Sequence, residues 1–246
     1  MNIKIVGIIS TSLTLTLAIV LVLPPFLSYQ FSTQPVLLSF TIDQKNDASK
    51  WCKQLSQILD QHDVKATVFV SGNTAENHPE CVTSFSNEID IGSQGYSNIS
   101  IPLIPDYSQQ LEEIRQGKQI IDRIGNFDSK LFKAPNGDTD QNIYSLLQKS
   151  KILADFSYVN QYNKFHDGQF IWFTIESYNA TEFSIDNIPK KSSERTHPII
   201  INFDNAYSIN EINDLLSEIK KQQVTFVSAS DLVGFELNPR GVSNDV

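Results

Sequence analysis

Short runs of apolar residues alternate along most of the chain with segments whose apolar residues recur at helical spacing. Because these runs are continuous, they predict strands that are buried on both faces. The expected strands are residues 36–40, 66–70, 88–91, 131–133, 169–174, 199–203 and 224–227. The expected helices are residues 48–61, 107–124, 142–149 and 209–221. This alternation predicts an α/β fold, with a parallel sheet or barrel and the helices outside. Residues 155–196 break the pattern and are interpreted as an excursion over one face of the barrel.

The size and charge of the chain narrow its class of function. Its 246 residues are enough for one domain with a sizeable core. The chain has 19 Lys and Arg residues against 28 Asp and Glu residues, a net charge of −9. This acidic balance argues against nucleic acid as a partner, because phosphates require a basic surface.

Residues 5–23 carry no charge and are mostly Ile, Leu and Val. A helix of this length spans roughly 28 Å, close to the hydrocarbon thickness of a bilayer. Small residues typical of a cleavage site are absent near residues 23–27, so an uncleaved signal anchor is favoured over a cleaved signal peptide. Lys4 precedes the segment, which favours a cytoplasmic N-terminus and an extracytoplasmic domain, hence a single-pass membrane protein.

The expected organisation follows from this segment. It consists of a short cytoplasmic N-terminus (1–4), a transmembrane helix (5–23), a tether (24–35), one folded domain (36–236) and a flexible C-terminal tail (237–246). The two cysteines, Cys52 and Cys81, would then lie in an oxidising compartment. A disulfide and two separate buried thiols remain alternatives, because sequence does not fix the distance between their Cα atoms.

Residues 91–98 read Ile-Gly-Ser-Gln-Gly-Tyr-Ser-Asn. This segment resembles the Ile-Gly-x-His-Thr-Tyr-Ser-His motif of the polysaccharide deacetylase family, the NodB homology fold. Residues 64–72, 78–80, 111–124 and 132–137 resemble further segments of that family in the same order. The resemblance covers residues 36–232 and implies a distorted (β/α)7 barrel of about seven strands. Active groups in such barrels lie at the carboxyl ends of the strands.

The resemblance also implies where a site would lie and how this chain departs from the family. The family holds a divalent metal, usually zinc, with one Asp and two His, and a second Asp is the general base. Gln94 and Asn98 stand at the two histidine positions. Two registers remain open for the first strand: Thr41 at the base position with Asp43 as the metal ligand, or Asp43 as the base with Gln44 as the ligand.

Three further motif positions are changed. Lys133 replaces the family's Arg, Asn136 replaces its Tyr, and Phe203 replaces the His that protonates the leaving amine. Asp204 is retained beside Phe203, so Asp43 and Asp204 are the remaining candidate catalytic carboxylates. Structural roles are the alternative for each: Asp43 or Asp204 in a turn or helix cap, and Lys133 in an ion pair with Asp43.

The substitutions predict that the family's metal is not retained, because amide oxygens are poor zinc ligands compared with imidazole. We therefore expect a membrane-anchored, extracytoplasmic, deacetylase-like protein that is catalytically impaired and acts on or binds envelope carbohydrate. The candidate aromatic residues for stacking on a sugar are Tyr96, Trp172, Tyr178 and Tyr207. The alternatives are an active hydrolase of the amide bond in N-acetylated sugars with an altered metal site, and an envelope interaction module that binds no sugar.

Overall fold

The computed structural model describes residues 32–43, 47–157, 166–167, 170–172, 177–191, 194–195 and 197–233. The predicted transmembrane helix at residues 5–23 and the predicted tail at 237–246 lie outside these residues. Among the helices that are described, none is both long and apolar enough to cross a membrane.

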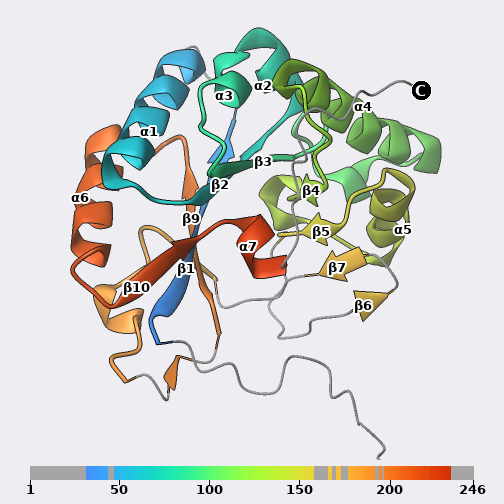
Figure 1. Ribbon diagram of the computed structural model, residues 1–246. Coiled ribbons are helices and arrows are strands. Elements are labelled where there is room, and N and C mark those ends of the chain that lie inside the picture. The colour runs from blue at the N-terminus through green and yellow to red at the C-terminus, as the bar shows by residue number, and fades with distance from the viewer. Residues whose placement is uncertain are drawn as a thin grey trace, which may run out of the picture.

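A single curved sheet forms the centre of the fold (Figure 1). Its neighbouring strands follow the order β6-β7-β5-β4-β3-β2-β1-β9-β8, and β10 pairs with the first half of β1. The strands are β1 (Gln34–Ile42), β2 (Ala66–Val70), β3 (Ile89–Ser93), β4 (Leu131–Phe132), β5 (Ala154–Asp155), β6 (His166–Asp167), β7 (Phe170–Trp172), β8 (Ser177–Asn179), β9 (Ile199–Asp204) and β10 (Val224–Val227). The pairs between described strands are parallel except for the short pair of β6 with β7.

The helices lie in an arc outside the strands, from α6 through α1, α3, α2 and α4 to α5 (Figure 1). The helices are α1 (Ala48–His62), α2 (Gly72–Asn77), α3 (Glu80–Thr83), α4 (Tyr107–Gly125), α5 (Gln141–Lys149), α6 (Ile209–Ile219) and α7 (Ala229–Val233). Three short 3-10 turns complete the described elements: η1 (Ile101–Leu103), η2 (Pro135–Gly137) and η3 (Ile185–Asn187).

The α/β class with parallel strands is therefore confirmed, and the barrel takes the form of a half-barrel. In the described part of the chain the sheet has ten strands, and its strand order ends at β6 and β8 without closing. The difference from a seven-stranded barrel arises in the region predicted to be an excursion. There β7 pairs with β5 and β8 pairs with β9, so these short strands extend the two edges of the sheet.

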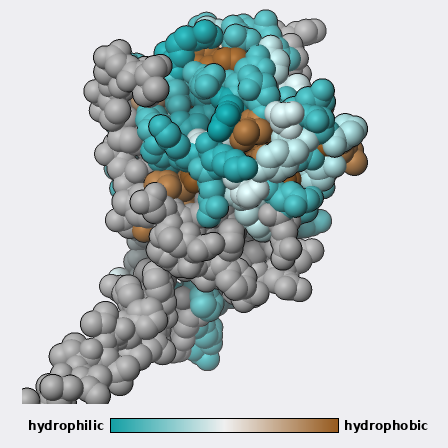
Figure 2. Space-filling model, turned by 90° about the vertical axis from the view of Figure 1, so that its right-hand side faces the viewer, coloured by the Kyte–Doolittle hydropathy of each residue, from teal (hydrophilic) through white to brown (hydrophobic). Residues whose placement is uncertain are grey.

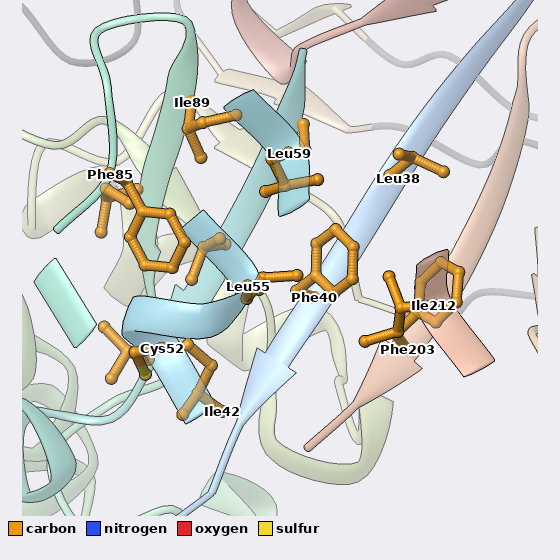
Figure 3. Packing of buried hydrophobic residues seen from close by; sticks show 14 of the residues in the cluster. Leu38, Phe40, Ile42, Cys52, Leu55, Leu59, Phe85, Ile89, Phe203 and Ile212 are labelled. Atoms are coloured by element: carbon orange, nitrogen blue, oxygen red, sulfur yellow. The ribbon is translucent and has the colours of Figure 1, made fainter. Parts of the chain in front are cut away.

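The main hydrophobic core lies between the sheet and the outer helices. Leu38, Phe40 and Ile42 are alternate residues of β1, and their side chains face this layer because successive side chains in a strand point to opposite faces. Leu55 and Leu59 of α1 pack in the same cluster (Figure 3). All five are fully buried, and burial of each such side chain stabilises the fold by about 1.5–3 kcal/mol.

A smaller core fills the inside of the half-barrel. Leu37, Phe69, Leu131 and Ile200 come from four strands, and Ala229 of α7 packs against them. Gly92 makes room for the ring of Phe69, since a Cβ at Gly92 would lie 2.7 Å from Phe69 Cδ1. The middle of the interior is thus apolar. Near the amino ends of β2 and β3, Thr67 and Asp90 face inward and accept hydrogen bonds from Ala229 and Ser230 of α7, and a second set of polar side chains lies near the carboxyl ends of the strands.

A disulfide joins Cys52 of α1 to Cys81 of α3, with the two Cα atoms 5.0 Å apart. Both cysteines are fully buried. The structure thus selects the disulfide over separate thiols. The bond fixes α3 beside the helix that covers β1.

The chain enters the sheet slightly earlier than expected. The predicted domain starts at residue 36, but β1 begins at Gln34, because Gln34 and Pro35 pair in register with Val224 and Thr225 of β10. On another face, the side of the molecule that carries α4 and α5 is largely hydrophilic among its described residues (Figure 2).

Candidate functional site

A cleft of about 540 Å³ opens at the carboxyl ends of the strands. Residues that follow or end β1, β3, β4, β8 and β9 form its walls. The lining residues are Thr41, Asp43, Gln94, Asn98, Lys133, Ala134, Asn136, Gly137, Asn179, Thr181, Asn202, Phe203, Asp204, Ala206, Tyr207 and Glu211. The cleft therefore brings together eight of the motif positions that the sequence singles out, from four separate segments of the chain. Gln44, the metal-ligand position in the second register, lies outside the described residues.

Backbone contacts hold the loop that carries Gln94 and Asn98. The N-terminus of α2 faces this loop: Gly72 N donates to Gly95 O and Asn73 N donates to Tyr96 O, both at 2.9 Å. On the other side, α4 approaches closely at Gly117, where a Cβ would lie 2.2 Å from Gly95 O. Because Gly117 has no side chain, the loop backbone packs directly on the helix.

A carboxylate on α4 fixes the far end of this loop. Glu113 Oε1 accepts from both the backbone N and the Oγ of Ser97, at 2.6 and 2.9 Å. Asn98 follows with a φ of 58°, a left-handed conformation that Asn tolerates better than most residues. This conformation presents the Asn98 side chain to Asp43, and Asn98 Nδ2 donates to Asp43 Oδ1 at 2.7 Å.

Several amide oxygens around Asp43 lack hydrogen-bond donors. Asn205 Nδ2 donates to the backbone O of Asp43 at 2.8 Å. Asn205 Oδ1, Asn98 Oδ1 and Gln94 Oε1 are all buried, and none has a hydrogen-bond partner among the described residues. Leaving such an acceptor buried and unpaired costs about 1–3 kcal/mol. The surroundings of Asp43 are therefore rich in acceptors and short of donors.

Lys133 supplies the buried amine of the cleft. It is only 3% exposed, and its Nζ donates to Ser39 Oγ at 3.0 Å and to Asn202 Oδ1 at 2.7 Å. Its Nζ also lies 5.4 Å from the centre of the Phe69 ring. Burial lowers the pKa of Lys133 to about 7, because removal from water disfavours the charged amine. The interior polar partners Ser39 and Asn202 were not anticipated, since each lies within an apolar strand.

The end of β9 places its residues on opposite faces of the sheet. Phe203 lies in the helix-facing core, where its ring stacks 4.8 Å from that of Phe40, although it also lines the cleft. Its neighbour Asn202 is the residue that reaches Lys133. Asp204 is exposed, and its Oδ1 accepts from Ala206 N at 2.7 Å. This hydrogen bond gives Asp204 a structural role in the turn after β9, which is the alternative to a catalytic role that the sequence left open.

Tyr207 is the aromatic side chain best placed for a ligand. It lines the cleft, its ring lies 5.5 Å from that of Phe203, and its hydroxyl accepts from Thr181 N at 2.9 Å. Asn136 lines the cleft as well, exposed and with a φ of 56°. An aromatic wall and several amides are typical components of a small-ligand site.

The other three aromatic candidates are not part of the described cleft wall. Tyr96 donates from its hydroxyl to Glu76 Oε2 at 3.3 Å and packs on the outer core. Tyr178 packs edge-on against Phe183, with ring centres 5.8 Å apart. The side chain of Trp172 lies outside the part of the structure that is described.

Asp155 is linked through Ser157 to Ala134, which lines the cleft. It ends β5 and is buried, and burial raises its pKa to about 6. Its carboxylate accepts from Ser157 N at 2.9 Å, and Ser157 Oγ in turn accepts from Ala134 N at 2.7 Å, next to Lys133. Sequence reasoning missed it, because a two-residue strand carries no periodic signal and Asp155 stands where the regular pattern ends.

The residues at the family's metal position do not fit a zinc ion. Zinc in proteins is held by His, Cys and carboxylate groups, whereas this cluster offers one carboxylate and two amides. Asn98 also directs its N–H, and not its amide oxygen, at Asp43. Within the described residues, no group of three or more His, Cys, Asp or Glu side chains is placed to hold a metal ion.

A curved parallel sheet with a polar cleft at the carboxyl ends of its strands is the architecture of barrel-type enzymes. The sequence profile of the polysaccharide deacetylase family matches residues 30–154, half of the chain. The chain belongs to the polysaccharide deacetylase family. A peptidoglycan-N-acetylglucosamine deacetylase from Bacillus cereus is 29% identical over 106 residues, which are 43% of this chain and 38% of that protein. The match thus spans well under half the length of that relative.

Solved structures share the fold at low sequence identity. A peptidoglycan deacetylase from Bacillus subtilis superposes with a TM-score of 0.59 at 17% identity, covering 82% of this chain and 91% of the other. A pseudoenzyme of the CE4 family from Bacillus anthracis gives a TM-score of 0.58 at 12% identity, covering 82% and 66%. A mutant of that pseudoenzyme with restored enzymatic activity is similar to the same degree, with a TM-score of 0.60.

Proposed function

We propose that this protein binds cell-envelope carbohydrate in its cleft and is impaired in metal-dependent deacetylation. The observation that carries the proposal is the contact between Asn98 and Asp43. Asn98 Nδ2 donates to Asp43 Oδ1 at 2.7 Å, so an amide occupies a metal-ligand position and is bonded to the carboxylate beside it. The cleft is kept, and its donor set no longer suits zinc.

The same contact favours one of the two registers for the first strand. In that register Asp43 is the remaining metal-ligand carboxylate and Thr41 stands at the position of the general base. Thr41 and Asp43 both line the cleft, while Ile42 between them is fully buried in the outer core. A threonine hydroxyl is not a base at neutral pH, so the base position itself offers no carboxylate to accept a proton from water.

Carbohydrate is the favoured ligand for two reasons. Family membership supports a polysaccharide, and the peptidoglycan deacetylases among the similar proteins support a cell-wall one. The walls also carry the chemistry that sugars require, since amides and carboxylates bind hydroxyls and Tyr207 offers a face on which a sugar ring can stack. Residues 5–23 would hold the domain at the outer face of a membrane, a proposal that rests on their uncharged, apolar sequence.

The test is calorimetric titration of the full chain with two tetrasaccharides, one of β-1,4-linked N-acetylglucosamine and one of β-1,4-linked glucosamine. Acetate release from the first is followed in parallel with added zinc. We expect binding of at least one tetrasaccharide and no acetate. The variant Tyr207→Ala should weaken binding about tenfold or more, because a stacking face is lost. Tyr107→Ala, at an exposed position on α4, is the matched control and should bind as the wild type does.

Two outcomes would replace the proposal. Acetate release that requires zinc and is lost in Asp43→Asn would identify an active hydrolase with an altered site. Binding of neither tetrasaccharide by a folded chain would favour an envelope interaction module that takes no sugar.

A further inference from the structure

The side-chain amides around Asp43 have a fixed orientation. Asn98 Nδ2 faces Asp43 Oδ1, and Asn205 Nδ2 faces the Asp43 backbone O. Both partners are acceptors only, so turning either amide would set two oxygens against each other. The oxygens of both amides must therefore point away from Asp43, and both are buried without a donor among the described residues.

Gln94 adds a third acceptor on the cleft side. Its side chain is 1% exposed and lines the cleft, and its Oε1 has no partner in the described part of the chain. Three of the five unpaired buried polar atoms of the described residues thus belong to Gln94, Asn98 and Asn205. Asn98 and Asn205 hydrogen-bond to Asp43, and Gln94 lines the same cleft as Asp43 and Asn98. The amine of Lys133, which lines the same cleft, gives hydrogen bonds to Ser39 and Asn202.

Such a cluster selects a ligand group that donates several hydrogen bonds and carries positive charge. A primary ammonium donates three hydrogen bonds and accepts none. A divalent metal ion fits less well, because calcium takes six to eight oxygen ligands and gains its affinity from several carboxylates. An N-acetyl group offers a single N–H and adds a carbonyl oxygen that would meet the acceptors.

We propose that the acceptor cluster of Asp43, Gln94 and Asn98 binds the free 2-ammonium group of a de-N-acetylated amino sugar. This inference rests on the proposed function, because it names the carbohydrate that the cleft takes. The protein would then recognise the product of deacetylation: a polymer already deacetylated by another enzyme of the cell envelope. The net charge of −9 favours association with a polymer that carries many ammonium groups.

The two tetrasaccharides test this directly when their dissociation constants for the full chain are compared. We expect the glucosamine tetramer to bind at least about tenfold more tightly than the N-acetylated one. Asp43→Asn should remove most of that preference, because it removes the charge and keeps an oxygen that faces Asn98. Gln94→Met should weaken the glucosamine tetramer selectively, because it removes one acceptor with little change of volume.

Glu112→Gln is the control, since Glu112 is exposed on α4 and is not among the residues that line the cleft. It should keep the preference, which separates recognition at Asp43 from the effect of the overall charge of the chain. Equal binding of both tetramers, or tighter binding of the N-acetylated one, would overturn this inference and leave the proposed function standing. Binding of neither would overturn both. Calcium that displaces the glucosamine tetramer at micromolar concentration would show a metal site in place of the ammonium site.

Discussion

Asn98 donates a hydrogen bond from Nδ2 to Oδ1 of Asp43 at 2.7 Å, between the loop after β3 and the end of β1. This bond joins two positions that would share a metal ion in the polysaccharide deacetylase family. In place of a shared metal ion, the Asp43 carboxylate has a neutral amide as its hydrogen-bond donor. Returning imidazole to this position should therefore restore metal binding.

The triple variant Thr41→Asp, Gln94→His, Asn98→His should bind about one zinc ion per chain, because it supplies two imidazoles and frees Asp43. Metal content after dialysis, measured by elemental analysis, is the readout. Adding Asp43→Asn to the triple variant should abolish zinc binding. A wild-type chain that retains as much zinc as the triple variant would show that Gln94 and Asn98 already suffice as ligands.

Lys133→Met should change how stability depends on pH. The pKa of Lys133 is lowered from 10.5 to about 7 in the folded protein. Between these values the unfolded chain holds the proton and the folded one does not, so wild-type stability rises with pH there. The gain is about 1.4 kcal/mol per unit of pH. This contribution to the free energy of unfolding is present in full above the unfolded pKa of 10.5 and is lost as pH falls to about 7.

Urea unfolding at pH 7, 8 and 9 measures this effect. The wild type should gain stability relative to Lys133→Met with each unit, while the Lys50→Met control, at an exposed position on α1, should run parallel to the wild type. Parallel curves for Lys133→Met and the wild type would show that the buried amine keeps its charge throughout this range.

Asp155→Asn tests a pH dependence of stability that runs in the opposite direction. Burial raises the pKa of Asp155 from 3.8 to about 6, so the folded state binds the proton more tightly. The resulting stability is present in full below the unfolded pKa and is lost as pH rises through about 6. The free energy of unfolding of the wild type should therefore fall by up to about 3 kcal/mol relative to Asp155→Asn between pH 4 and pH 7. A constant difference between the two proteins over that range would contradict the raised pKa.

The disulfide between Cys52 and Cys81 should contribute measurably to stability. It closes a loop with a sequence separation of 29. The chain-entropy estimate for a loop of this length is about 3–4 kcal/mol. The double variant Cys52→Ala, Cys81→Ala should lose about that much in urea unfolding. Dithiothreitol should produce a comparable loss in the wild type and none in the variant; a wild type insensitive to the reductant would indicate that the bond is absent.

Much of the fold was predictable because buried parallel strands leave a direct signal. The apolar runs in β1, β2 and β9 are short and continuous, which indicates buried strands. Each of these strands lies within two residues of the expected range. The edges of the sheet were not predictable. Strands such as β5 and β8 have two or three residues, and their place is set by pairing with a neighbour.

The candidate site, like the fold, was predictable only in part. The resemblance to the deacetylase family implied that Gln94, Asn98 and Lys133 belong to one site, and the structure places all three in one cleft at the carboxyl ends of the strands. The resemblance did not reveal that Phe203 faces the outer core while Asn202 faces inward. That distinction depends on the register of β9 beside β1, which pairs Asn202 with Ser39 and Phe203 with Phe40.

The central claim is that the cleft is retained and its hydrolytic chemistry is impaired. Acetate release from the tetramer of N-acetylglucosamine, with the full chain in excess zinc, tests it most directly, with an active peptidoglycan deacetylase assayed beside it. We expect release indistinguishable from the protein-free blank. Sustained release by the wild type that disappears in Asp43→Asn would contradict it.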